Sequence, residues 1–282
     1  MPSISSFWHY ARERLRIARP LNELARSRHD RIPVVVSLTS YPARIGRVHL
    51  TIRSIAHQSS PPAQIVLVLA RSEFSGAVDS LPSPLQRLLQ ELDGVLSILW
   101  VEENTRSYKK LIPARGEFPG RDIVTADDDV LYPFDWLSRL HSAHLSAPTA
   151  IIGSRGSRIT TVSDGTKLAP YANWPRAADK ETSLRVFLTG RGGIYYPVGS
   201  LNARVDDVPS ATRLAPTADD VWFKACGILN GSPSSIVDFG EEFPPNGADQ
   251  RGALYRENVT DLNDKALRAV FSELGIAAAD FS

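Results

Sequence analysis

This chain of 282 residues contains one cysteine and one methionine, and its net charge is close to zero. The one cysteine, Cys226, excludes a disulfide framework and a zinc site built from several cysteines. The longest apolar runs, such as residues 65–70, are far shorter than the roughly 20 residues of a membrane-spanning helix. A net charge of +1 argues against general nucleic-acid binding, which usually shows as a strongly basic domain. The N-terminus also lacks the apolar stretch of a signal peptide, so we expect a cytoplasmic protein.

What the chain does have is an ordinary globular composition. Apolar residues make up 43% and charged residues 22%, close to the averages of folded domains, so disorder of the whole chain is excluded. The basic residues are uneven, with 26 arginines and six lysines. Against that background the adjacent pair Lys109 and Lys110 stands out.

Residues 1–31 form a basic segment that differs from the remainder of the chain. Seven arginines are set against three acids between residues 3 and 31, and the pattern predicts a helix that breaks near Pro20. In one interpretation this helix packs on the main domain or on a partner subunit. In the other it is a basic amphipathic helix that contacts anionic lipid at the inner face of the plasma membrane. We therefore divide the chain into an N-terminal helical extension, residues 1–31, and one domain, residues 32–282.

Strands and helices alternate four times in the first half of that domain. Apolar and β-branched runs predict strands at 32–37, 65–70, 95–101 and 122–126. Helical spacing predicts helices at 48–57 and 84–92, and a short helix that opens at 108–111 and is cut at Pro113. This alternation is typical of an α/β fold with a mostly parallel sheet and helices on both faces.

The second half is less regular. Its patterns predict strands at 150–153, 184–189 and 194–197, and helices at 218–229 and 264–274.

Three adjacent aspartates, Asp127, Asp128 and Asp129, follow directly on the predicted strand 122–126. Ligands of open α/β sheets bind beyond the carboxyl ends of the strands. Three neighbouring carboxylates repel one another unless a cation or strong donors offset their charge. Alternate residues of an extended chain point the same way, so Asp127 and Asp129 are expected to share a target. Their oxygens suit Mg²⁺ or Mn²⁺ held together with substrate phosphates. The simpler alternative is a solvated acidic turn.

Six short motifs occur in order over about two-thirds of the chain. They are SLTSYPARI (37–45), QSSPP (58–62), SYKKLIPA (107–114), IVTADDDVLYP (123–133), TGRGGIYYP (189–197) and APTADDVWF (215–223). As an ordered set they resemble bacterial glycosyltransferases of the GT-A fold, broadly the family 2 enzymes of surface-polysaccharide assembly. The resemblance implies a nucleotide-sugar donor, with a UDP-sugar expected, and a divalent metal, Mn²⁺ or Mg²⁺. It also implies transfer to the hydroxyl of a glycan or lipid-linked glycan.

The resemblance implies roles for both acidic groups. Asp127, Asp128 and Asp129 match the DXD motif, in which Asp129 would hold the metal between the donor phosphates. Asp127 would contact the ribose, the sugar hydroxyls or a metal-bound water, and Asp128 belongs to the same donor site. Asp219 and Asp220 match the acidic pair, usually Glu-Asp, that supplies the general base of inverting members. We take Asp220 as the base, with Asp219 as the alternative. The late histidine that several members place on the metal has no counterpart, because all six histidines lie at or before residue 144.

The chemistry of glycosyl transfer points to further donor-site residues. The leaving diphosphate develops negative charge that cations stabilise, and Lys109, Lys110 and Arg106 lie before the fourth strand. Thr39, Tyr41 and Arg44 follow the first strand and Arg71 follows the second, where similar enzymes hold the nucleotide. Ordinary surface positions are the alternative for the lysines.

Candidates for the acceptor side lie in the second half. Gly192 and Gly193 allow close approach of a ligand to the backbone, although a plain turn explains them equally well. Tyr195 and Trp174 offer apolar faces on which a sugar can stack, and core packing is the alternative.

Three rival functions fit part of the pattern. A haloacid-dehalogenase-type phosphatase would use Asp127 as its nucleophile, but its motif follows the first strand, whereas three βα units precede residue 127 here. A nucleotidyltransferase usually has a glycine-rich basic loop after the first strand, and SLTSYPARIG contains only Gly46. A non-catalytic sugar-binding protein would not need both acidic groups. We therefore predict a metal-dependent glycosyltransferase, inverting in its stereochemistry.

Overall fold

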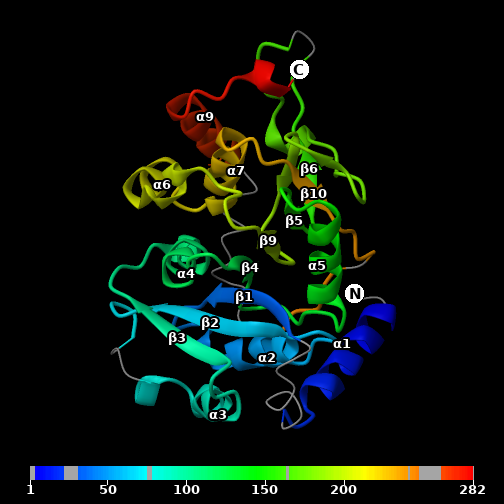
Figure 1. Cartoon of the computed structure of the whole chain (residues 1–282), viewed down its shortest axis with the longest axis vertical. Helices are drawn as coiled ribbons and strands as arrows, with labels where there is room; N and C mark the ends of the chain where they lie inside the picture. Colours follow the sequence, from blue (N-terminus) through cyan, green and yellow to red (C-terminus); the bar gives the residue numbers. More distant parts are fainter. Residues whose placement is uncertain are drawn as a thin grey trace. The chain divides into compact units, whose positions relative to one another are not determined.

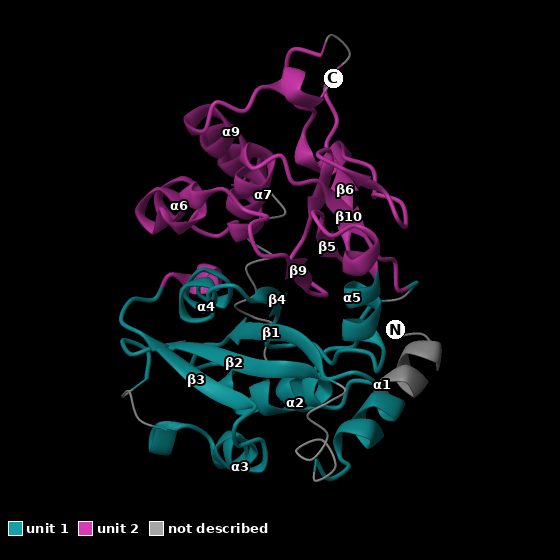
Figure 2. Cartoon of the chain, in the orientation of Figure 1, with its two compact units in different colours: residues 1–104, 109–142, 240–249 teal, residues 105–108, 143–239, 250–282 magenta. Residues whose placement is uncertain are grey.

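The computed structural model describes residues 4–21, 31–74, 78–162, 165–240, 242–247 and 262–281, with side chains from residue 11 onward. The chain forms two compact units (Figure 2). Unit 1 contains residues 1–104, 109–142 and 240–249, and unit 2 contains residues 105–108, 143–239 and 250–282. The predicted split into an extension and one domain remains a prediction.

Unit 1 is built on parallel strands in the order β3–β2–β1–β4. These strands are β1 (Ile32–Thr39), β2 (Pro62–Ala70), β3 (Leu96–Val101) and β4 (Asp122–Ala126). In the register of the central strand, Val36 lies opposite Ile65 on one side and Val124 on the other, and all three side chains are fully buried. Continuous apolar strands of this kind are those of a parallel sheet covered on both faces.

Helices cover both faces of these strands. Helices α2 (Ile45–Ala56) and α3 (Ser83–Glu91) lie on one side of β1 and β2, and α4 (Ile112–Glu117) lies on the other (Figure 1). The four predicted strands and the predicted helices at 48–57 and 84–92 are thus confirmed, with ends that differ by a few residues. The prediction that Pro113 cuts a helix was wrong. Pro113 lies in the first turn of α4, where a missing backbone N–H breaks no helical hydrogen bond.

Unit 2 combines short mixed strands with helices. Strand β10 (Ser234–Ile236) runs parallel to β5 (Ile151–Gly153) and antiparallel to β7 (Thr182–Ser183). Strand β9 (Ile194–Tyr196) is antiparallel to β5, and β6 (Gly156–Arg158) pairs with β8 (Val186–Leu188). The helices are α6 (Val208–Leu214), α7 (Asp219–Leu229) and α9 (Leu262–Glu273). The patterns predicted β5, β8, β9, α7 and α9 but missed β6, β7, β10 and α6.

The remaining elements are short or join the two units. Helix α5 (Trp136–Ser146) begins in unit 1 and ends in unit 2. Turns of 3-10 helix occur at Val78–Ser80, Arg106–Lys110, Tyr171–Asn173, Ala203–Asp206 and Ala278–Phe281.

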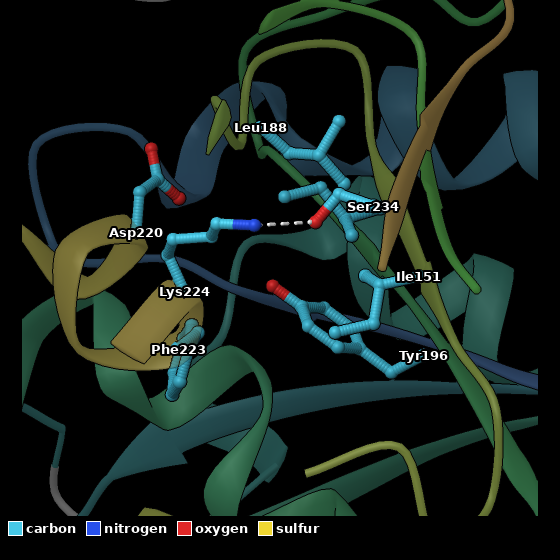
Figure 3. A pocket seen from close by; sticks show the side chains of 8 residues that line it. Ile151, Leu188, Tyr196, Asp220, Phe223, Lys224 and Ser234 are labelled. Carbon is cyan, nitrogen blue, oxygen red and sulfur yellow. Dashed lines mark hydrogen bonds between the residues drawn. The ribbon is translucent and has the colours of Figure 1, made fainter. Parts of the chain in front are cut away.

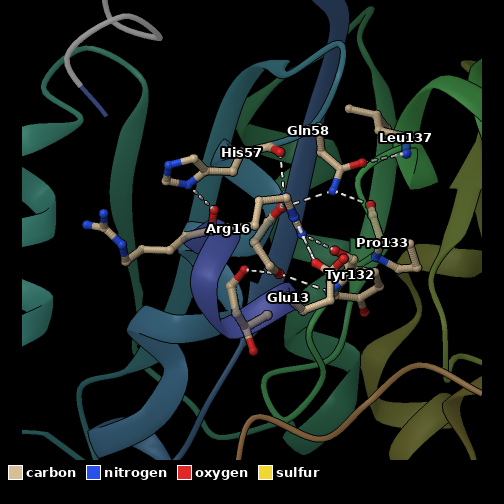
Figure 4. A network of polar contacts seen from close by, with 10 residues as sticks. Glu13, Arg16, His57, Gln58, Tyr132, Pro133 and Leu137 are labelled. Atoms are coloured by element: carbon tan, nitrogen blue, oxygen red, sulfur yellow. Dashed lines mark hydrogen bonds and ion pairs between the residues drawn. The ribbon is translucent and has the colours of Figure 1, made fainter. Parts of the chain in front are cut away.

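Helix α1 (Ile4–Ile17) is attached to the rest of unit 1 by Arg16. The Arg16 guanidinium pairs with Glu13 and donates to the backbone carbonyl oxygens of Ser54, His57 and Tyr132 (Figure 4). The Tyr132 carbonyl lies 2.6 Å from Nη2. These carbonyls come from the end of α2 and the segment after β4, so one half-buried cation joins three parts of the chain. The structure therefore fits the interpretation that the predicted N-terminal helix packs on the domain.

The helix ends before Pro20, as predicted, while residues 22–30 lie outside the described part of the chain. Its outward side carries Arg12 and Leu15, whose side chain is 73% exposed, and the exposed Arg19 follows the end of the helix. Among the described helices, none combines the length and the apolar character that crossing a bilayer requires.

Replacing Arg16 with Met is expected to lower the free energy of unfolding by about 2–4 kcal/mol, because Glu13 and three carbonyls lose a charged donor. Chemical denaturation measures this. Arg12→Met, at an exposed position of the same helix, is the control and is expected to leave stability nearly unchanged. Equal denaturation midpoints for the two variants would contradict the anchoring role of Arg16.

Candidate functional site

The three predicted aspartates lie at the carboxyl end of β4 and differ in exposure. The side chain of Asp127 is 29% exposed, that of Asp128 is 7% exposed and that of Asp129 is 17% exposed. The backbone N–H of Asp127 donates to the hydroxyl of Tyr132 at 2.8 Å, which fixes the start of the turn. Asp127 and Asp129 are thus the more accessible pair, although Asp128 and Asp129 lie in a turn and share the partner Arg44, which the alternation of an extended chain did not predict.

Asp128 is held inside unit 1 by polar partners. Ser40 donates its hydroxyl to Oδ2 at 2.5 Å, and Arg44 donates from Nη1 to Oδ1 at 3.0 Å. Burial raises the pKa of Asp128 to about 6, Ser40 and Arg44 oppose that shift, and Asp129 adds to it. The same Arg44 nitrogen lies 3.0 Å from Oδ2 of Asp129. Burial lowers the pKa of Arg44, but the two carboxylates raise it above its ordinary value. One guanidinium therefore pairs with two of the three carboxylates.

The backbone of the aspartate turn is held by a residue far along the chain. Asn246 donates from Nδ2 to the carbonyl oxygen of Asp128 at 2.8 Å and to Oγ1 of Thr51 at 3.0 Å. The backbone N–H of Asn246 donates to the carbonyl oxygen of Asp129 at 2.8 Å. Thr51 in turn donates to the carbonyl oxygen of Val130 at 2.7 Å. Asn246 is fully buried, so the segment 242–247 fixes the backbone of all but the first aspartate.

The two lysines before β4 have different partners. Lys110 points its ammonium to Oδ1 of Asp127 at 3.4 Å, so it lies beside the aspartate turn as predicted for a donor-site cation. Lys109 is 2% exposed and pairs with Glu73 at 2.8 Å, on the turn after β2. Lys110 thus lies beside the aspartate turn, whereas Lys109 forms an ion pair with Glu73.

The other predicted donor residues follow β1 and β2. The Thr39 hydroxyl donates to the carbonyl oxygen of Val68 at 2.8 Å, within the sheet. Tyr41 lies under the guanidinium of Arg44, 5.5 Å from the ring centre. Arg71 stacks on Trp100 and pairs with Glu102 at 3.1 Å, and its side chain is half-exposed.

A divalent metal fits the accessible carboxylates only if a ligand completes its shell. Within the described residues, no three His, Cys, Asp or Glu side chains gather around one point. Asp127 and Asp129 are hard oxygen donors next to a rim where ligands of α/β sheets bind. Mg²⁺ is typically held by one or two carboxylates together with substrate phosphates. The donor set therefore fits a metal that arrives with a phosphorylated ligand.

The second acidic pair begins helix α7 in unit 2. Asp219 is buried and Asp220 is half-buried. The backbone N–H of Gly190 donates to Oδ2 of Asp220 at 2.9 Å, which orients that carboxylate. Tyr108 lies nearby: burial raises its pKa most, and the charges of Asp219 and Asp220 raise it further. The positive end of the α7 dipole favours ionised carboxylates at this place.

Of the predicted acceptor residues, the two glycines belong to the turn that contacts Asp220, and the two aromatic side chains pack elsewhere in unit 2. Gly192 and Gly193 have φ angles of +93° and +87°, a conformation that favours glycine, so the turn that presents Gly190 to Asp220 depends on them. Tyr195 is fully buried and stacks on His144 with ring centres 4.6 Å apart. Trp174 is buried and donates from Nε1 to the carbonyl oxygen of Ala169 at 3.0 Å. Both aromatic side chains thus take the packing role that was the stated alternative.

Sequence reasoning missed several residues of the site. Ser40 lies inside the motif at 37–45, but its polar side chain carried no distinguishing signal. Asn246 and Gly247 after Pro244 and Pro245 have the composition of an ordinary turn. The hydrogen bond from Gly190 uses its backbone, which leaves no side-chain signature.

Comparison with known proteins identifies solved structures but no sequence family. The sequence matches no known family profile and no curated protein. The structure is similar to that of the mannosyltransferase PcManGT from Pyrobaculum calidifontis in complex with GDP-Man and Mn²⁺. The TM-score is 0.52 at 17% identity, over 98% of this chain and 76% of that chain. It is also similar to S. aureus TarS 1–349, with a TM-score of 0.51 at 15% identity, over 89% of this chain and 70% of that chain.

These similarities establish the fold. The chain has a mixed α/β fold with mostly parallel strands flanked by helices, and it shares this fold with the two proteins. The predicted GT-A-like fold class is confirmed. Function still has to be argued from the residues of the site.

Asn246→Ala is expected to lower the free energy of unfolding by about 2–3 kcal/mol, because the buried carbonyl of Asp128 and the hydroxyl of Thr51 lose a donor. Denaturation followed by tryptophan fluorescence measures this. Asn173→Ala, at an exposed position, is the control. An Asn246→Ala protein as stable as the Asn173→Ala protein would show that the segment 242–247 does not support the aspartate turn.

Proposed function

We propose that the protein is a metal-dependent glycosyltransferase that moves a sugar from a nucleotide-diphosphate donor to an acceptor hydroxyl. The observation that carries this proposal is the aspartate turn at the carboxyl end of β4, with Asp127 and Asp129 accessible and Asp128 held inside. The fold is shared with a mannosyltransferase whose structure contains GDP-Man and Mn²⁺. The phosphatase alternative gains no support, since the aspartates follow the fourth strand of the chain and not the first.

On this proposal the aspartate turn is the donor site. Asp129, with Asp127, would hold Mn²⁺ or Mg²⁺ against the donor diphosphate, and the bound cation would act as a Lewis acid on the leaving group. Lys110 lies next to Asp127 and can pair with a phosphate oxygen when the donor binds. Arg44 holds Asp128 and Asp129 in place through its two ion pairs. In this proposal Asp127, Asp129 and Lys110 bind the metal and the diphosphate, and Arg44 supports the aspartate turn.

Asp220 is the proposed general base. It is more exposed than Asp219, and the N–H of Gly190 orients its carboxylate. A base must be accessible to the hydroxyl whose proton it takes, and Asp220 is the more exposed of the two acids. Because the base acts on the acceptor, this assignment implies inversion at the anomeric carbon.

The finer assignments remain predictions. They include the UDP-sugar as donor, a glycan or lipid-linked glycan as acceptor, and a role in surface-polysaccharide assembly. Location in the cytoplasm and peripheral membrane contact through residues 3–31 also remain predictions. The outward position of Arg12, Leu15 and Arg19 is compatible with such contact, while Arg16 serves the packing of the helix.

Release of nucleoside diphosphate from a panel of nucleotide sugars tests the proposed reaction. We expect release with at least one donor in the presence of Mn²⁺ and none after full chelation. Asp129→Asn is expected to weaken binding of the nucleoside diphosphate in Mn²⁺ by at least about tenfold, since even residues that support metal ligands have effects of that size. Asp135→Asn, an exposed aspartate in unit 1, is the matched control. Activity that survives chelation would refute the metal role.

Asp220→Asn is expected to reduce transfer by about 10²–10⁴-fold with donor binding unchanged, because the variant cannot take the acceptor proton. Initial rates and calorimetric binding of the donor separate the two effects. Asp219→Asn is the companion variant and is expected to lose less. A larger loss in Asp219→Asn would transfer the role of base to Asp219.

A further inference from the structure

Lys224 is a buried lysine one helical turn after Asp220 on α7. Its side chain is 5% exposed, and it lines a small cavity together with Asp220 and Tyr196 (Figure 3). Residues four apart on a helix are neighbours on its surface, so the amine and the carboxylate share one face of α7. Neither the predicted chemistry nor the predicted site used this lysine.

The amine of Lys224 has little to offset its charge. In the part of the chain that the structure describes, its polar contact is a hydrogen bond from Nζ to Oγ of Ser234 at 3.2 Å. No carboxylate of the described residues lies within ion-pair distance of it. A buried cation without a counter-ion is costly, and burial accordingly lowers the pKa of Lys224 to about 7. A lysine of this kind changes charge near neutral pH.

Polar side chains from α7, β9 and β10 line the same cavity. Its volume is about 10 Å³, which is the space of about one water molecule. Its walls are apolar except for Asp220 and Lys224 on α7, Tyr196 on β9 and Ser234 on β10. In Figure 3 the Lys224 side chain points toward Ser234, and the Tyr196 hydroxyl points into the same space. A water there would find the two to four polar partners that it needs.

We propose that Lys224 is a positioning residue for the transfer reaction: its amine and the Asp220 carboxylate form a coupled pair, linked through this cavity, that sets how readily Asp220 accepts a proton. The inference rests on the proposed role of Asp220. In the reaction the acceptor oxygen bonds to the anomeric carbon as the bond from that carbon to the diphosphate breaks, and Asp220 takes the hydroxyl proton.

The sign of the coupling follows from charge. An ammonium beside Asp220 stabilises the carboxylate and makes it a weaker base, whereas a neutral amine does not. Among the residues that line the cavity with Lys224, the titratable groups are Asp220 on its own helix and Tyr196 on β9, while the other five contribute no charge. Transfer should therefore rise as pH increases through the range in which Lys224 loses its proton.

The pair can be tested without any activity by NMR of the lysine side chains, because the chain has only six lysines. Lys224→Met, which has a similar length and no charge, identifies the Lys224 signal by its disappearance. We expect that signal to titrate near pH 7. Asp220→Asn should lower the midpoint by at least about half a pH unit, because an opposite charge is lost. A Lys224 midpoint near 10, or one that Asp220→Asn leaves unchanged, would overturn the coupling.

The pH profile of transfer tests the functional part of the inference. Lys224→Met should lose the rise near pH 7, while Lys265→Met, at an exposed position of α9, should keep it. A wild-type profile in Lys224→Met would overturn the positioning role even if the NMR titration succeeds. If Lys224 titrates as expected but no nucleotide sugar is consumed, the coupled pair stands and the proposed function fails, so the two failures are distinguishable.

Discussion

Three consecutive carboxylates at the end of a buried strand are the constraint on which unit 1 depends. Their repulsion would push the turn away from the sheet unless other groups offset it. The protein turns the middle carboxylate inward onto Ser40 and Arg44, and Lys110 approaches the first. Two cations against three carboxylates leave one net negative charge at the accessible edge. A divalent cation between this edge and a diphosphate would offset the repulsion between the two anions.

The parallel strands explain why the charges gather at this place, and distant parts of the chain explain why they stay there. The strands β1 and β4 end side by side, which puts Arg44 and the aspartates at one rim. Asn246, 195 residues after Thr51, then closes the turn from the other end of the sequence. Binding geometry of this kind is pre-organised, because the backbone carbonyls of Asp128 and Asp129 are already satisfied.

The fold and the acidic groups could be predicted from sequence because they depend on local pattern. The run at 32–37 and the abrupt change from DIVTA to three aspartates are visible without any tertiary information. Supporting residues were not predictable in this way, since Asn246 acts across the whole chain and Gly190 acts through its backbone. Lys224 did leave a signal, its spacing of four from Asp220, but only its burial reveals the consequence. Tyr195 and Trp174 show the opposite case. Their residue types suggested sugar binding, but in the structure both rings are packed inside the protein.

Each unit carries one acidic group, the aspartate turn in unit 1 and the start of α7 in unit 2, and the proposed reaction requires both. The claim at the centre is that the aspartate turn holds a divalent cation together with a diphosphate. Anomalous diffraction from crystals containing Mn²⁺ and a nucleoside diphosphate tests it most directly. The account predicts a manganese peak between the carboxylates of Asp129 or Asp127 and the two phosphates. A manganese ion or a diphosphate bound away from that turn would contradict it.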